Sequence, residues 1–129
     1  MEKSSALNEV LVGHLRAKDT YLANAKVMID KGETEKASEL LWGACLQMVF
    51  ALYSLKGITL PDHGTTKRYV LELSKEIKDE EIWKLFGLLE KLHANFYHGF
   101  LTKEEFPQYV EAAKNFITKL EKVLKEKVS

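Results

Sequence analysis

Apolar residues recur every three or four positions along almost the whole chain, and this spacing limits most strongly what the chain can fold into. It is clearest between residues 82 and 100. With residues placed about 100° apart, the apolar and aromatic side chains there share one arc of about 140°. They are Ile82, Leu85, Phe86, Leu89, Leu92, His93, Phe96, Tyr97 and Phe100. No stretch alternates with a period of two for long enough to predict a strand, so we expect an all-α protein.

Scarce glycines and prolines divide this pattern into five predicted helices. We expect one long helix over about residues 4–31 and a second from 33 or 34 to 55. A short third helix follows the loop 56–64 and a cap at Thr65 or Thr66, and the fourth spans about 79–98. Thr102 and Glu105 form a capping box before the fifth, which ends in a frayed tail at 125–129. The prediction is one domain over residues 1–129, an antiparallel up-and-down bundle of four long helices and one short helix.

The second helix is apolar around most of its circumference, with Trp42 and Cys45 in its middle. Such a helix cannot face water on one side. It must either lie at the centre of the bundle or bury its outer side against a second subunit. We interpret Cys45 as a buried, inert thiol.

Charge and cysteine content exclude several classes of function. The chain has 19 basic and 19 acidic residues, so it has no general attraction to nucleic acid or to anionic membranes. No apolar run approaches the roughly 20 residues of a membrane span. A single cysteine and a polar N-terminus without a signal sequence favour a cytoplasmic protein. We expect no cofactor.

The fourth helix carries two groups of candidate site residues. His93 and Tyr97 lie on the predicted core stripe, and with Trp42 and His63 they would line a small-molecule pocket. Lys91, Asn95 and His98 stand on the opposite side at spacings that let their side chains meet. In a catalytic interpretation His98 acts as acid or base and Lys91 holds a phosphate.

Asn95 and the two histidines of this helix support two further expectations. Asparagine gains little at a helix surface, so we expect Asn95 to be buried, either near Trp42 or under a partner subunit. His93 and His98 lie on different sides of the helix and cannot share one metal ion, so we expect no metal site.

Residues 37–44, which contain Trp42-Gly43-Ala44, and the run Leu92-His93-Ala94-Asn95-Phe96-Tyr97 resemble the archaeal PaREP repeat-family proteins. His63, which precedes a short predicted helix, fits this resemblance as well. These proteins are similar to the HEPN superfamily of helical bundles, and the resemblance covers about residues 21–124. It implies an up-and-down bundle, commonly a homodimer, linked to nucleotidyltransferase partners or to RNA cleavage.

The resemblance has one departure, which concerns catalysis. Ribonucleases of the HEPN superfamily carry an arginine a few residues before a histidine, whereas neither Arg16 nor Arg68 stands at such a spacing. The sequence therefore favours a non-catalytic, dimeric HEPN-like module that binds a partner protein or a nucleotide-type ligand. The alternative is a metal-independent ribonuclease with a degenerate motif. Its RNA substrate fits less well with the zero net charge.

Overall fold

A computed structural model describes residues 2–57 and 62–129, with side chains described from residue 8 onward. This part of the chain forms five helices and no strand. They are α1 (Glu2–Asp30), α2 (Thr34–Ser54), α3 (His63–Glu76), α4 (Glu80–His98) and α5 (Phe106–Val128). The all-α prediction is confirmed for the described residues. Positions 58–61 of the predicted loop lie outside them. None of the described helices has a stretch that is both long and apolar enough to cross a membrane.

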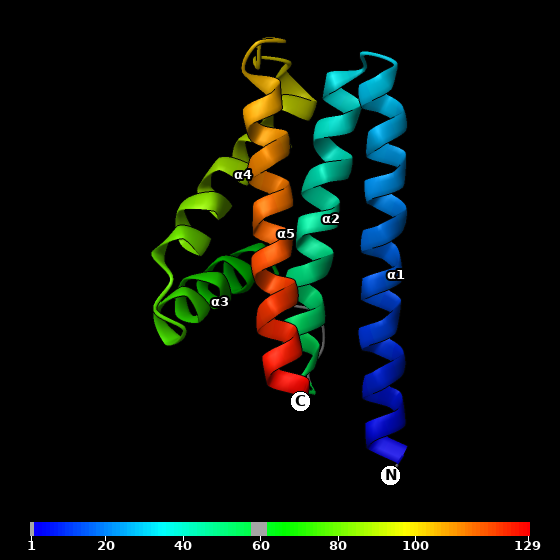
Figure 1. Cartoon of the computed structure of the whole chain (residues 1–129), viewed down its shortest axis with the longest axis vertical. Helices are drawn as coiled ribbons and strands as arrows, with labels where there is room; N and C mark the ends of the chain where they lie inside the picture. The colour runs from blue at the N-terminus through cyan, green and yellow to red at the C-terminus, as the bar shows by residue number, and fades with distance from the viewer. Residues whose placement is uncertain (1, 58–61) are drawn as a thin grey trace.

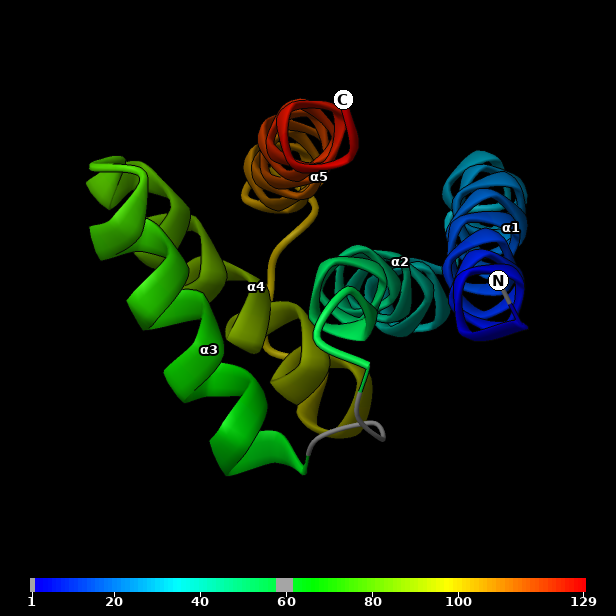
Figure 2. The same cartoon turned by 90° about the horizontal axis from the view of Figure 1, so that it is seen from below.

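Helix α2 is the central element of the fold. It contacts each of the other four helices, and Figure 2 shows it between α1 on one side and α4 and α5 on the other. In Figure 1, α2 returns beside α1 in the opposite direction. Its buried side chains include Leu41, Trp42, Met48 and Leu52. Most of the broad apolar surface of α2 is therefore covered by the other helices of the chain, whereas Leu46 and Phe50 stay partly exposed.

The lone cysteine lies inside α2, as the sequence indicated. Cys45 is buried, and its Sγ lies 3.8 Å from the carbonyl oxygen of Ala113 in α5. Burial raises the pKa of this thiol well above its ordinary value, because the thiolate would lose its hydration. Cys45 is thus a core residue and not a nucleophile.

Helix α1 is one continuous helix, and Lys18 in its middle connects it to α5. The Lys18 side chain is buried, and its Nζ lies 2.9 Å from an Asp19 carboxylate oxygen and 3.0 Å from a Glu121 oxygen. Burial alone would lower the pKa of Lys18, but the two carboxylates outweigh it and the pKa is raised. The apolar stem packs on the core while the charged end is paired.

The start of α3 differs from the prediction. Asp62, and not Thr65 or Thr66, caps this helix: its Oδ1 accepts a hydrogen bond from the Thr65 N–H at 2.7 Å. An Asp side chain can bond the free N–H groups of a first turn, and that bond fixes where the turn begins. His63 is consequently the first residue of α3 and not a loop residue.

The capping box before α5 is confirmed. The Glu105 N–H donates to Thr102 Oγ1 at 3.1 Å, and the Thr102 N–H donates to Glu105 Oε1 at 3.2 Å. The regular helix starts directly afterwards, at Phe106, and it continues to Val128. The tail that we expected to fray is therefore helical, and its Lys127 pairs with Glu76 of α3 at 3.2 Å.

The core stripe predicted for α4 is correct up to Leu92, and the prediction is wrong for the aromatic residues that follow. Phe96, Tyr97 and Phe100 were expected in the core, but they are 38%, 67% and 49% exposed. Asn95 is instead fully buried. Asn95 lies only about 60° around the helix from Leu92. Because α4 crosses α2 at a tilt (Figure 1), the buried face turns around the helix toward Asn95 and away from the aromatic rings.

Candidate functional site

The four side chains predicted to line a pocket come together around Trp42. The ring centroid of Trp42 in α2 lies 6.2 Å from that of His63 in α3 and 5.4 Å from that of His93 in α4. His93 in turn meets Tyr97 edge to face at 5.4 Å. We call these four residues the Trp42 cluster. Its indole is buried and His93 is partly exposed, whereas His63 and Tyr97 are exposed, so the cluster is closed on its core side and open to solvent on its outer side.

A carboxylate fixes the orientation of His93. The Nδ1 atom of His93 lies 2.9 Å and 3.2 Å from the two carboxylate oxygens of Glu39. An ionised carboxylate only accepts hydrogen bonds, so Nδ1 carries the proton. In the neutral ring Nε2 is then an acceptor directed away from Glu39. Glu39 also holds the ring stacked on Trp42, with 27° between the two planes.

His63 also lies near a carboxylate. Its Nε2 lies 3.5 Å from a Glu90 carboxylate oxygen, and Lys67 Nζ lies 3.4 Å from the same oxygen. The Lys67 ammonium also stands over the Trp83 ring, 6.0 Å from its centroid. The neighbourhood of His63 therefore adds one cation and one anion to the rim of the Trp42 cluster.

These contacts define what the cluster can do chemically. Its exposed ring faces can stack with a planar heteroaromatic ligand, and the free His93 nitrogen can hydrogen-bond to it. Among the residues that the structure describes, no three histidine, cysteine or acidic side chains lie close enough together to hold a metal ion. Stacking, hydrogen bonding and charge are the interactions that the side chains of the cluster can offer to a ligand.

The structure does not gather the other predicted group, Lys91, Asn95 and His98, at one surface. Lys91 and His98 are exposed, whereas Asn95 is buried inside the chain. Its Nδ2 donates to Ser38 Oγ at 3.0 Å, and its Oδ1 accepts from the Leu101 N–H at 2.8 Å. We call this group of Asn95, Ser38 and Leu101 the Asn95 node. It ties the end of α4 to α2, four residues before Trp42, and leaves Asn95 with no direct access to a substrate.

Two further contacts close the node. Ser38 Oγ donates onward to the Thr34 carbonyl oxygen at 2.7 Å. Gly99, which ends α4, has a φ of 56°, a left-handed conformation that glycine adopts without strain. A Cβ at this position would also meet the Glu35 carboxylate, which is the far end of an exposed side chain and can move aside. The left-handed backbone therefore favours glycine where the chain turns back toward α5.

Sequence reasoning missed the polar partners of both groups. Glu39 stands three residues before Trp42, and Glu90 stands three residues before His93, so each lies on the same helix face as a predicted site residue. That spacing was the signal that could have found the two carboxylates. Ser38 gave no such signal, because a small residue within an apolar run also fits ordinary close packing.

Comparison with known proteins adds one finding. The model of the archaeal PaREP1/PaREP8 family matches residues 13–117. No curated protein and no solved structure matches the chain.

Proposed function

This chain belongs to the archaeal PaREP1/PaREP8 family, and we propose that it is a non-catalytic helical module that binds a nucleotide-type ligand at the Trp42 cluster. One observation supports the proposal most directly. Aromatic and imidazole rings from α2, α3 and α4 meet at a site whose outer side is open to solvent. Every nucleobase has a flat face that stacks on aromatic and imidazole rings. A site assembled from three helices is also rigid enough to hold such a ligand in one orientation.

In the proposed complex the base lies against Tyr97 and His93. The Tyr97 ring is the most exposed of the four, and Phe96 supports it edge to face with 5.0 Å between centroids. His93 Nε2 accepts a hydrogen bond from a ring N–H or an amino group of the base. Lys67, on the rim beyond His63, pairs with Glu90 and supplies a cation that can turn to a phosphate instead.

Calorimetric titration with AMP, ATP and GTP tests the proposal. We expect at least one nucleotide to bind, and we expect Tyr97→Ala to weaken its binding about tenfold or more, since base stacking on one aromatic ring is worth roughly 1–3 kcal/mol. His93→Ala should weaken binding as well. His14→Ala is the matched control, because His14 is also hydrogen-bonded, to Gln47 at 2.7 Å, but lies outside the cluster. Absence of binding at millimolar nucleotide, or equal loss in the control, contradicts the proposal.

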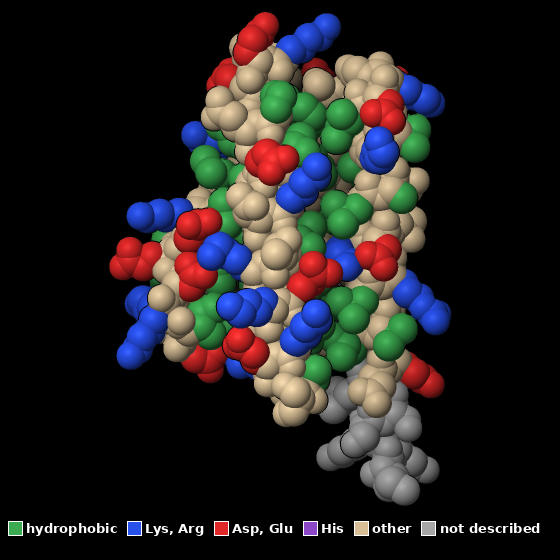
Figure 3. Space-filling model, in the orientation of Figure 1, with side chains coloured by type: hydrophobic (Ala, Val, Ile, Leu, Met, Phe, Trp, Pro, Cys, Tyr) green, Lys and Arg blue, Asp and Glu red, His purple; other side chains and the backbone are tan. Residues whose placement is uncertain are grey.

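The proposal includes an up-and-down HEPN-like bundle that forms a homodimer in the cytoplasm and pairs with a nucleotidyltransferase-type protein, as the family resemblance implies. Its support is the direction of the helices in Figure 1 and the apolar surface in Figure 3, where hydrophobic side chains follow the seam between α5 and α1. Val12 and Val27 of α1 are also largely exposed. Sedimentation equilibrium at micromolar concentration should give the mass of a dimer, and a clean monomer contradicts this part.

A further inference from the structure

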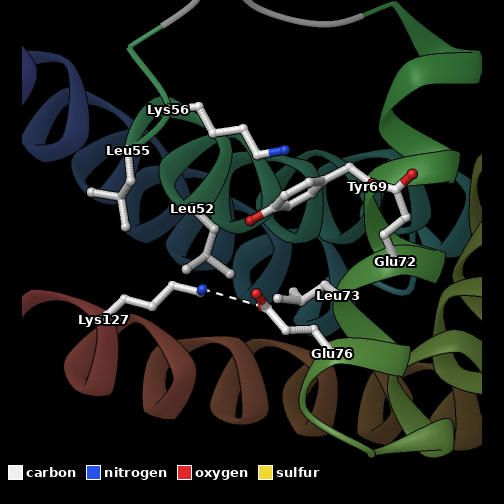
Figure 4. Close-up of a pocket in the computed structure, with 8 residues that line it drawn as sticks. All are labelled: Leu52, Leu55, Lys56, Tyr69, Glu72, Leu73, Glu76 and Lys127. Atoms are coloured by element: carbon white, nitrogen blue, oxygen red, sulfur yellow. Dashed lines mark hydrogen bonds and ion pairs between the residues drawn. The ribbon is translucent and has the colours of Figure 1, made fainter.

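A hollow lies at the C-terminal end of α2, apart from the Trp42 cluster. It is formed by the C-terminal end of α2, by α3 and by the last turn of α5, and it encloses about 490 Å³ (Figure 4). Leu52, Leu55 and Leu73 form its apolar part. This volume is in the usual range of small-molecule pockets, which combine an apolar wall with a few polar groups.

The first polar group is the hydroxyl of Tyr69. Tyr69 is only 8% exposed, and in Figure 4 its hydroxyl points into the hollow, toward Leu52. This hydroxyl makes no hydrogen bond to any other described residue. No buried side-chain nitrogen or oxygen of the described residues lacks a hydrogen-bond partner, so this hydroxyl is reached by solvent and can donate a hydrogen bond to a ligand. Burial, helped by the nearby Glu76 and Tyr53, raises the pKa of Tyr69 to about 12. The hydroxyl therefore keeps its proton at physiological pH.

The second polar group is the ammonium of Lys56. It stands over two aromatic rings, 5.0 Å from the centroid of Tyr69 and 5.5 Å from that of Tyr53. Within the described chain it forms no ion pair with a carboxylate. The other lysine of the hollow differs, because Lys127 is neutralised by Glu76 at 3.2 Å. Lys56 is thus the cation that an anionic ligand would meet.

The acidic side chains of the hollow leave room for such an anion. Glu76 is engaged by Lys127, as the dashed line in Figure 4 shows. The Glu72 carboxylate points away from Leu52 and Leu55 in the same view. The lining thus carries two lysines and two glutamates, and Lys56 is the lysine whose charge no carboxylate of the described residues offsets by an ion pair. A cationic ligand would instead be repelled by Lys56.

We propose that this hollow binds a small carboxylate with an apolar tail, whose carboxylate accepts hydrogen bonds from Lys56 and Tyr69 while the tail packs on Leu52, Leu55 and Leu73. The assignment is independent of nucleotide binding at the Trp42 cluster, because the two sites share no residue.

Calorimetric titration of the full chain with hexanoate, hexanol and acetate tests both halves of this chemistry. Hexanoate should bind. Hexanol lacks the charge and acetate lacks the tail, so each should bind at least about tenfold more weakly than hexanoate. Equal binding of hexanol and hexanoate would show that no anion is recognised. No detectable hexanoate binding overturns the proposal outright, and neither result depends on a variant that must fold.

Two variants, each of which removes one functional group, locate the site. Tyr69→Phe removes only the hydroxyl, and Lys56→Met removes only the charge, so each should weaken hexanoate binding about tenfold, as expected for a lost hydrogen bond to a charged group. Tyr53→Phe is the matched control, since Tyr53 packs edge to face on Tyr69 at 5.2 Å but does not line the hollow. Equal loss in Tyr53→Phe, or no loss in Tyr69→Phe, overturns the proposal. Tyr97→Ala should leave hexanoate binding unchanged, which separates this site from the Trp42 cluster.

Discussion

The Asn95 node and the Trp42 cluster both join α4 to α2, yet they differ in how their polar atoms are used. In the node, Asn95 bonds through both ends of its amide, and Ser38 both accepts and donates. In the cluster, His93 uses one ring nitrogen on Glu39 and has the other available. A closed network of buried hydrogen bonds holds a fold in one arrangement. A half-used polar group at an open surface can instead recognise a ligand.

This difference predicts opposite responses to mutation. Removing one member of a buried, fully paired network leaves the other members without partners in a place that water does not reach. Removing one member of a half-exposed ion pair leaves a group that water can solvate. The node should therefore govern the free energy of unfolding, and the cluster should govern binding.

Asn95→Ala should have the largest effect on stability. It leaves the Leu101 N–H and Ser38 Oγ without their partner and opens a small cavity, so we expect a loss of about 2–4 kcal/mol. Urea denaturation measures it. Asn115→Ala, at an exposed position of α5, is the control and should change stability by less than about 0.5 kcal/mol. Similar losses in the two variants would mean that the Asn95 node is not a structural network.

Gly99→Ala tests the turn that closes the node, with a smaller effect. The left-handed backbone at this position costs an alanine roughly 1–2 kcal/mol, and the added Cβ also meets the Glu35 carboxylate. The Glu35 carboxylate is the far end of an exposed side chain and can move aside, so we expect almost the same cost in a Glu35→Ala background. A double-mutant cycle by urea denaturation measures the difference. A clearly smaller cost in the Glu35→Ala background would show that Glu35 is held in place and adds to the strain.

The sequence predicted features that depend on local chemistry and missed those that depend on how helices cross. The capping box at Thr102 follows from residue types alone, and periodicity limited α2 to two places, the centre of the bundle or an interface with a second subunit. Burial of Asn95 could be expected because asparagine is a poor choice for a helix surface, but its partner Ser38 could not. Exposure of Phe96 and Tyr97 depends on the tilt of α4 across α2, and a helical wheel contains no information about tilt.

The same limit explains the two groups of candidate residues. Trp42, His63, His93 and Tyr97 come together because aromatic side chains near the core contact one another from several directions. Lys91, Asn95 and His98 depend on one straight face of α4 remaining at the surface. The turn of the buried face toward Asn95 separates that residue from the other two.

Glu39→Ala should have the smallest effect on stability and is the sharpest test of the comparison. Its pair with His93 is about one-third exposed, so the loss should stay within about 1 kcal/mol. Nucleotide affinity should nevertheless fall, because the imidazole loses the carboxylate that fixes its tautomer and orientation. Glu111→Ala, at an exposed position of α5, is the control for both measurements. If Glu39→Ala destabilises the chain as much as Asn95→Ala does, the cluster is part of the framework and the distinction between the two regions fails.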